Sequence, residues 1–180
     1  MRKITIKIIS LFGILLLALT SVSVQADTPK RGGTLVMTIG TTPRHLNPAV
    51  QSGIATGEPG AQLFATLVRF DDKWNAEPYL ASSWKTSADG LAVTFNLVEG
   101  ATFHDGTPIT SKDVAFSIKT IKANHPFKTM FRAVSSVETP SANTVVFKLS
   151  QPHPALMLAL SSQLGSIIPE LWNNRSKLRR

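Results

Sequence analysis

The 180-residue sequence predicts an α+β fold. Three observations lead to this prediction: β-prone runs are short and frequent, an amphipathic helix pattern interrupts them, and the two kinds of element follow no regular strand–helix–strand order. No internal repeat appears at the periods of about 20 to 50 residues that mark solenoid proteins. The chain is long enough for one domain with a real apolar core, but not for two full lobes.

The first elements expected along the chain are a strand and a long loop. Residues 34–39 follow a glycine pair and are β-prone, so they predict a strand. Residues 41–60 contain three prolines and three glycines without an apolar period, so they predict an irregular loop. Residues 61–70 begin with a helical pattern and end in a possible strand at 68–70.

The later strands have clearer patterns. Residues 91–98 alternate between apolar and polar side chains, as a half-buried strand does. Residues 134–138 and 144–149 are two further strand candidates, and the run at 81–85 fits either a strand or a helix.

Two helices are expected. Thr110 and Asp113 stand three residues apart in front of an apolar helical period, which predicts a helix that begins with a capping box. Residues 154–161 begin with a proline, which the first turn of a helix tolerates, so they predict a second and shorter helix.

Residues 1–26 have the charge order of an export signal. Basic residues precede an apolar run over 8–19, and the small side chains up to Ala26 suit a signal peptidase. A retained anchor would need about 20 apolar residues to cross the hydrocarbon core, and this run is shorter. We therefore expect cleavage before Asp27 and a mature protein outside the cytoplasm.

The net charge of +8 does not indicate a nucleic-acid binder. Of the 19 basic residues, three lie in the first 26 positions and four in the last six, which leaves 12 against 11 acidic residues in between. The body of the chain therefore lacks the basic clusters that nucleic-acid binding needs.

The sequence contains no cysteine. Its stability cannot come from disulfides, and no cysteine is available to carry the lipid of a lipoprotein. A second long apolar run is also absent from the sequence. These features predict a diffusible periplasmic protein, which we expect to be a monomer.

Catalytic and metal-binding motifs are not found. The four histidines are far apart, and no nucleophile elbow, zinc-protease motif or phosphate-binding loop is present. His104 and Asp105 are the pair most like a catalytic site, but Asp105 precedes Gly106 in a turn dipeptide, where aspartate bonds backbone amides. We expect no catalytic residue, no metal and no cofactor; a secreted hydrolase that uses this pair is the alternative.

The best candidate for ligand binding is the loop after the first predicted strand. It places hydroxyl, guanidinium, imidazole and amide groups beyond a strand's carboxyl end, where ligands bind in many α/β proteins. An ordinary solvated loop is the alternative that composition favours. The predicted ligand-binding residues are Thr41, Thr42, Pro43, Arg44, His45 and Asn47.

A series of ordered motifs is similar to one known family. The motifs are RGGTL at 31–35, TPRHLNP at 42–48, LASSW at 80–84, SADGL at 87–91, VTFNL at 93–97, GATFHDGTP at 100–108 and TSKDVAFS at 110–117. Their order and spacing resemble the peptide- and nickel-binding family, family 5, of the extracytoplasmic solute-binding proteins of ABC transporters. One departure is Val98-Glu99, where the family usually has a basic residue.

The resemblance implies the N-terminal part of a periplasmic-binding-protein-like α/β fold of type II. After the signal peptide, it implies a first strand of lobe one at 27–40, an accessory domain at 41–164, and a return to lobe one at 165–180. The basic tail after Pro169 has no place in the family pattern. We therefore expect a truncated or frame-shifted sequence in which the second lobe is missing.

The resemblance also implies a function. It implies a non-catalytic periplasmic protein that captures di- and oligopeptides for an ABC importer and delivers them to permease subunits in the inner membrane. In the family the segment after the first strand lies against the peptide main chain, and the region of His104 and Asp105 is scaffold. Alternative ligands within the family are a nickel chelate, an opine or an oligosaccharide, and a periplasmic chaperone or sensor is an alternative of another class. With one lobe, peptide binding should be no tighter than millimolar.

Overall fold

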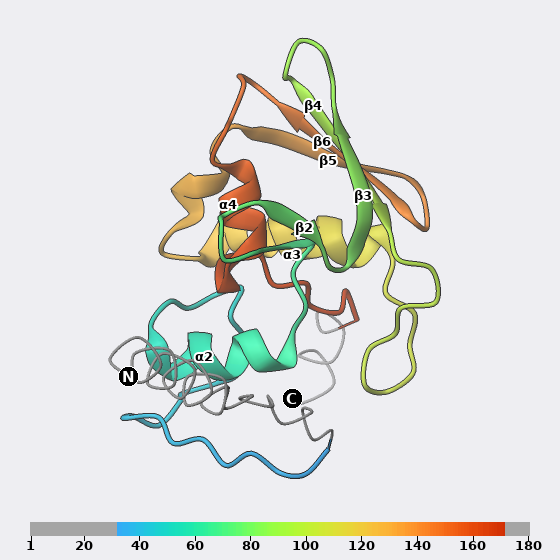
Figure 1. Cartoon of the computed structure of the whole chain (residues 1–180). Coiled ribbons are helices and arrows are strands. Elements are labelled where there is room, and N and C mark those ends of the chain that lie inside the picture. The colour runs from blue at the N-terminus through green and yellow to red at the C-terminus, as the bar shows by residue number, and fades with distance from the viewer. Residues whose placement is uncertain (1–31, 172–180) are drawn as a thin grey trace, which may run out of the picture. The chain divides into compact units, whose positions relative to one another are not determined.

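The computed structural model describes residues 32–171 (Figure 1). The chain divides into two units, residues 1–37 and residues 38–180, which are described separately. The predicted signal peptide at 1–26 and the basic tail at 175–180 lie outside the described residues. Within residues 32–171 no helix is both long and apolar enough to cross a membrane.

The strand predicted at residues 34–39 is not formed, which corrects that prediction. These residues have neither strand nor helix, and the side chains of Leu35, Val36 and Met37 are 81%, 82% and 61% exposed. The physical reason is that a strand exists only when a neighbouring strand supplies its ladder hydrogen bonds, and no described strand pairs with this segment. The composition of residues 34–39 therefore favours a strand, but no strand forms there.

The second unit is built around a four-stranded antiparallel sheet. Its strands are β3 (Ala81–Thr86), β4 (Ala92–Leu97), β5 (Val134–Ser141) and β6 (Thr144–Leu149), and their spatial order is β3-β4-β6-β5 (Figure 1). The predicted strands at 91–98, 134–138 and 144–149 are confirmed, and the ambiguous run at 81–85 is a strand.

The two central strands alternate as their sequences predict. Every second residue of β4 and β6 is buried, while the residues between them are more exposed. Phe95 of β4 and Phe147 of β6 meet edge to face with ring centroids 5.4 Å apart, a geometry that adds about 1 kcal/mol to their burial. The inward side chains are Val93, Phe95, Leu97, Val145, Phe147 and Leu149.

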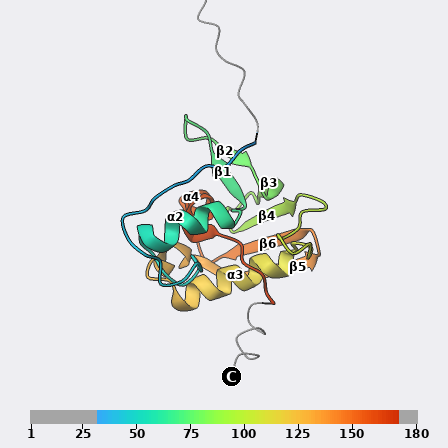
Figure 2. The same cartoon turned by 90° about the horizontal axis from the view of Figure 1, so that it is seen from below.

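The helix α3 (Ser111–Asn124) packs against β5 and β6 (Figure 2). Val114, Ile118 and Ile121 are its buried apolar side chains, and their spacing is the one that predicted the helix. The predicted capping box is present: the Thr110 backbone N–H donates to Asp113 Oδ2 at 2.8 Å. The sequence pattern, the local cap and the packing agree for this helix.

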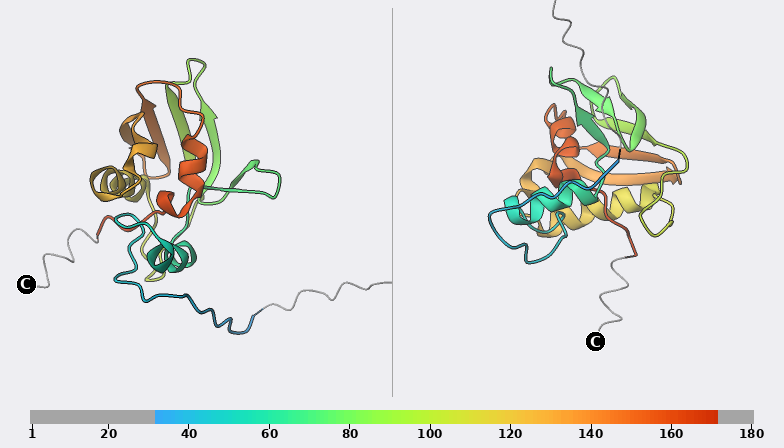
Figure 3. Two further views of the ribbon diagram at one scale, coloured as in Figure 1. Left: turned by 90° about the vertical axis from the view of Figure 1, so that its left-hand side faces the viewer. Right: turned by 60° about the horizontal axis from the view of Figure 1, so that its bottom comes forward.

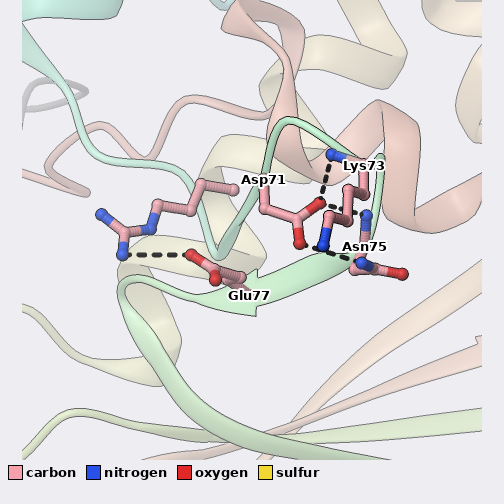
Figure 4. A network of polar contacts seen from close by, with 5 residues as sticks. Asp71, Lys73, Asn75 and Glu77 are labelled. Atoms are coloured by element: carbon pink, nitrogen blue, oxygen red, sulfur yellow. Dashed lines mark hydrogen bonds and ion pairs between the residues drawn. The ribbon is translucent and has the colours of Figure 1, made fainter. Parts of the chain in front are cut away.

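A two-stranded hairpin extends from the body of this unit (Figure 3, left). It consists of β1 (Val68–Phe70) and β2 (Ala76–Pro78), with Phe70 opposite Ala76. The side-chain carboxylate of Asp71 accepts the backbone N–H groups of Lys73 and Asn75 at 2.9 and 2.7 Å (Figure 4). A further bond from the Asn75 side chain contributes most to lowering the pKa of Asp71.

Shorter helical segments follow the sheet and its connections. They are the 3₁₀ turn Lys128–Phe131, the helix α4 (Leu156–Ser161) and the 3₁₀ turn Gln163–Gly165. The helix predicted at 154–161 is confirmed, and α4 packs against β1.

The helix α2 (Ile54–Leu63) corrects the prediction of a continuous loop over residues 41–60. Its sequence contains Pro59 and two glycines, which lower helix propensity. A Cβ at Gly57 would overlap the Gln163 side chain, and a Cβ at Gly60 would lie 2.9 Å from the Pro48 side chain. The glycines therefore permit close packing, and tertiary contacts rather than propensity stabilise this helix.

Candidate functional site

A cavity of about 380 Å³ lies beside the loop that carries the predicted ligand-binding residues. Five parts of the second unit line it: Leu46 in the loop, the end of α2 with the two residues after it, the residue after β2, the turn before α3, and the segment after α4. The lining residues are Leu46, Gln62, Leu63, Phe64, Ala65, Tyr79, Thr102, Phe103, His104, Ile109, Ile167 and Pro169.

The walls of this cavity are mainly apolar, with a few polar groups. Phe64, Phe103 and Ile109 provide half-buried apolar surface, whereas Tyr79 and His104 are exposed and offer a hydroxyl and an imidazole. A concave apolar surface with a few polar groups is the usual character of a small-molecule site. The cavity lies in the size range of such sites, at its lower end.

The predicted binding loop is largely exposed. The side chains of Thr41, Thr42, Arg44 and His45 are exposed, and those of Pro43 and Asn47 are half-buried. None of these six residues lines the cavity. Leu46, which is not among the predicted residues, does line it.

Hydrogen bonds within the loop give His45 and Asn47 structural roles. His45 Nδ1 accepts the Asn47 backbone N–H at 3.2 Å, and Asn47 Oδ1 accepts the Ala49 N–H at 2.9 Å. The His45 carbonyl also accepts the hydroxyl of Thr56 on α2 at 3.3 Å. These bonds fix the second half of the loop and leave its first half, with Arg44, facing solvent.

The turn at His104 and Asp105 forms as the turn dipeptide predicted. Asp105 Oδ1 accepts the backbone N–H and the hydroxyl of Thr107 at 3.1 and 2.6 Å, and Gly106 has a φ of +82°. Asp105 therefore stabilises its own turn, while the neighbouring His104 lines the cavity. Within residues 32–171, no three side chains of His, Asp or Glu come close enough together to hold a metal ion.

The far wall of the cavity is fixed by two buried polar residues: Ser117, which the sequence analysis did not single out, and Asp113, which it predicted only as part of the cap of α3. Ser117 Oγ accepts the Ile168 N–H at 2.8 Å and donates to the Asp113 carbonyl at 2.6 Å. Asp113 Oδ1 accepts the Glu170 N–H at 2.9 Å. In the sequence, the sign of this role was a serine on the apolar face of α3. Its partner could not be found from the sequence, because it lies 51 residues away along the chain.

A family model matches residues 75–179, which is more than half of the chain. Its description is bacterial extracellular solute-binding proteins, family 5, middle part. The chain belongs to this family. The resemblance stated from the motifs is confirmed, and the family is one of solute-binding proteins of ABC transporters rather than of enzymes.

A curated relative and two solved structures are similar to this chain. A putative ABC transporter peptide-binding protein of Brucella ovis is 39% identical over 118 residues, which cover 59% of this chain and 22% of the relative. The binding protein AgaA of A. tumefaciens R10, solved with agropinic acid, has a TM-score of 0.69 and 31% identity, over 76% of this chain and 28% of AgaA. NikZ of Campylobacter jejuni, solved with Ni(L-His), has a TM-score of 0.65 and 32% identity, over 74% of this chain and 27% of NikZ.

These similarities confirm the predicted fold class. The described unit is an α+β part of a periplasmic-binding-protein fold of type II. The chain spans about a fifth of the length of the curated relatives it matches first.

Proposed function

We propose that this protein is the periplasmic solute-binding component of an ABC importer and that its solutes are peptides. The observation that carries the proposal is the family match over residues 75–179, together with the relative of 39% identity named as peptide-binding. The protein would act by binding alone, as a monomer, without catalysis or a cofactor. Its partners would be the peptide and the permease subunits of the inner membrane.

The loop at 41–47 is the part of the site that we assign to this chain. An extended peptide presents a row of amide donors and acceptors, which backbone and hydroxyl groups satisfy without recognising side chains. Thr41 and Thr42 supply exposed hydroxyls, and the exposed Arg44 guanidinium suits a bidentate bond to a carboxylate such as a peptide C-terminus. This geometry favours peptides of varied sequence.

The proposed domain organisation follows the family. Residues 27–40 would belong to the first large lobe, residues 41–164 to the accessory domain, and residues 165–180 to the return. Hinge closure of two lobes around the solute would precede delivery to the permease.

A second candidate is a carboxylate ligand of another kind, either an opine or a nickel chelate. The structures of AgaA with agropinic acid and NikZ with Ni(L-His) favour it, because both are more than 30% identical to this chain. Arg44 would serve the same purpose for these ligands, since a guanidinium binds any exposed carboxylate.

Ligand-observed NMR by saturation transfer separates these candidates, because it also detects weak binding. The full chain would be titrated with a tetrapeptide, with the same peptide amidated at its C-terminus, with agropinic acid and with Ni(L-His). The proposal expects a signal for the peptide that falls on amidation. A signal from agropinic acid or Ni(L-His) without one from the peptide would replace the proposal by the second candidate, and no signal from any ligand would contradict both.

A further inference from the structure

Thr56 is a buried threonine of α2 that forms a hydrogen bond with the predicted binding loop. The residue has no exposed surface, and its hydroxyl donates to the backbone carbonyl of His45 at 3.3 Å. A buried hydroxyl without a partner is costly, so such groups are hydrogen-bonded in native proteins. The bond joins residues 11 positions apart and links α2 to the loop at 41–47.

The hydroxyl of Thr56 bonds differently from the hydroxyls of α3. Those of Ser117 and Thr120 each donate to a carbonyl four residues earlier on the same helix. This local bond is the usual one for a serine or threonine inside a helix. Thr56 stands in the first turn of α2, and its hydroxyl bonds outside the helix. Its bond therefore holds another segment of the chain rather than α2 itself.

The loop contacts α2 at a second point, one turn further along the helix. A Cβ at Gly60 would lie 2.9 Å from the side chain of the buried Pro48, and the neighbouring Ala49 has no exposed surface. Positions four apart lie on the same face of a helix, so Thr56 and Gly60 present one face to the loop. Residues 45–49 are therefore held against this face of α2.

The Thr56 bond fixes a peptide group that lies between two important side chains. The His45 carbonyl belongs to the planar peptide group that joins His45 to Leu46. Arg44, on one side, is exposed to solvent, while Leu46, on the other, lines the cavity. A planar group turns as a unit, so a change in its orientation would move both side chains.

We propose that Thr56 is a positioning residue of the solute-binding loop: its bond holds the His45–Leu46 peptide group so that Arg44 is presented to the carboxylate of a peptide before the peptide binds. A loop that is ordered in advance loses less conformational entropy on binding than a free loop does. The consequence for affinity rests on the proposed function, whereas the effect of the bond on the ligand-free loop does not.

Three variants of the full chain test the proposal in NMR titrations with a tetrapeptide and with its C-terminally amidated form. Thr56→Val removes the hydroxyl but keeps the shape, and Thr56→Ser keeps the hydroxyl. Thr66→Val is the matched control, because Thr66 is also buried and its hydroxyl donates to the Val68 carbonyl at 2.7 Å.

Thr56→Val should bind the tetrapeptide about fivefold more weakly than the native chain, because the loop must then be ordered on binding. The amidated peptide lacks the carboxylate that Arg44 binds, so its affinity should be the same in both. Thr56→Ser and Thr66→Val should bind both peptides as the native chain does. A native affinity for the tetrapeptide in Thr56→Val, no recovery in Thr56→Ser, or an equal loss in Thr66→Val would overturn the proposal.

A double variant tests whether Thr56 acts through Arg44. Two changes that remove the same interaction are not additive, whereas independent losses multiply. Arg44→Ala combined with Thr56→Val should therefore bind the tetrapeptide as weakly as Arg44→Ala alone. A further fivefold loss in the double variant would show that Thr56 acts independently of Arg44, against the proposal.

The ligand-free chain provides a test that does not depend on solute binding. Loss of a hydrogen bond to a carbonyl changes the ¹³C shift of that carbonyl and the ¹⁵N shift of the following amide. We expect these changes at His45 and Leu46 in Thr56→Val but not in Thr56→Ser or Thr66→Val. Unchanged shifts in Thr56→Val would contradict the proposal. The expected shifts in a chain that binds no peptide would count against the proposed function alone.

Discussion

The two ends of α3 are fixed by different chemistry, the N-terminal end by bonds to a distant segment and the C-terminal end by a local bond. At the N-terminal end, Ser117 accepts the backbone N–H of Ile168, and Asp113 accepts that of Glu170. These bonds hold the segment that forms the far wall of the cavity. At the C-terminal end, the buried His125 is held locally, because its Nδ1 accepts the backbone N–H of Phe127 at 3.0 Å. Burial lowers the pKa of His125, so we expect this end of α3 to respond to mild acid.

The largest effect is expected from Asp113→Ala. This change removes the capping-box acceptor for Thr110 and leaves the Glu170 N–H without its partner. Lost bonds to a charged acceptor at a helix start should lower the free energy of unfolding by about 3 kcal/mol. Urea denaturation followed by circular dichroism measures it, and a loss below about 1 kcal/mol would show that the N-terminal attachment contributes little.

Ser117→Ala should have the next largest effect. The Ile168 N–H is buried and would lose its acceptor, so the free energy of unfolding should fall by about 2 kcal/mol. Thr120→Ala on the same helix is the matched control, because its hydroxyl only bonds the Phe116 carbonyl one turn back. We expect a change within about 0.5 kcal/mol for the control in the same denaturation experiment. Equal losses for both variants would contradict a specific role for Ser117.

The pH dependence of unfolding should separate the two ends of α3. Because the pKa of His125 is lowered in the folded state, folded stability should be complete above the ordinary histidine pKa and should decline as the pH falls below it. The slope should be smaller in His125→Asn and unchanged in Ser117→Ala. Denaturation curves at several pH values measure it, and a slope that disappears in Ser117→Ala instead would reverse the comparison.

The sequence predicted some elements of the fold and missed others. The strands β4 and β6 and the helix α3 follow from local patterns, since alternation, helical period and the Thr110–Asp113 cap all agree. The helix α2 could not be predicted, because its glycines are explained by close contacts with Pro48 and Gln163. The strand expected at 34–39 depends on a partner strand, which composition cannot supply.

The candidate site was predicted only in part. The polar residues from Thr41 to Asn47 were recognisable because they carry hydrogen-bonding groups. The cavity beside them was not, because it brings together residues from Leu46 to Pro169 that share no local pattern. Tertiary proximity of this kind cannot be deduced from spacing along one chain.

The smallest effect on stability, and the largest on function, is expected from Arg44→Ala. Its side chain is exposed, so the free energy of unfolding should change by less than about 0.5 kcal/mol. Binding of a tetrapeptide should nevertheless weaken by about tenfold, which is the effect of losing roughly 1.4 kcal/mol from a charged hydrogen bond. Arg132→Ala, another exposed arginine, is the control and should bind as the native chain does.

The most direct test of the account is a titration of the ¹⁵N-labelled full chain with a tetrapeptide, followed amide by amide in NMR spectra. We predict that the largest shift changes fall on residues 41–47 and that they weaken in Arg44→Ala but not in Arg132→Ala. Shift changes confined to the cavity residues, or an unaltered response in Arg44→Ala, would contradict the assignment of the loop as the solute-binding element.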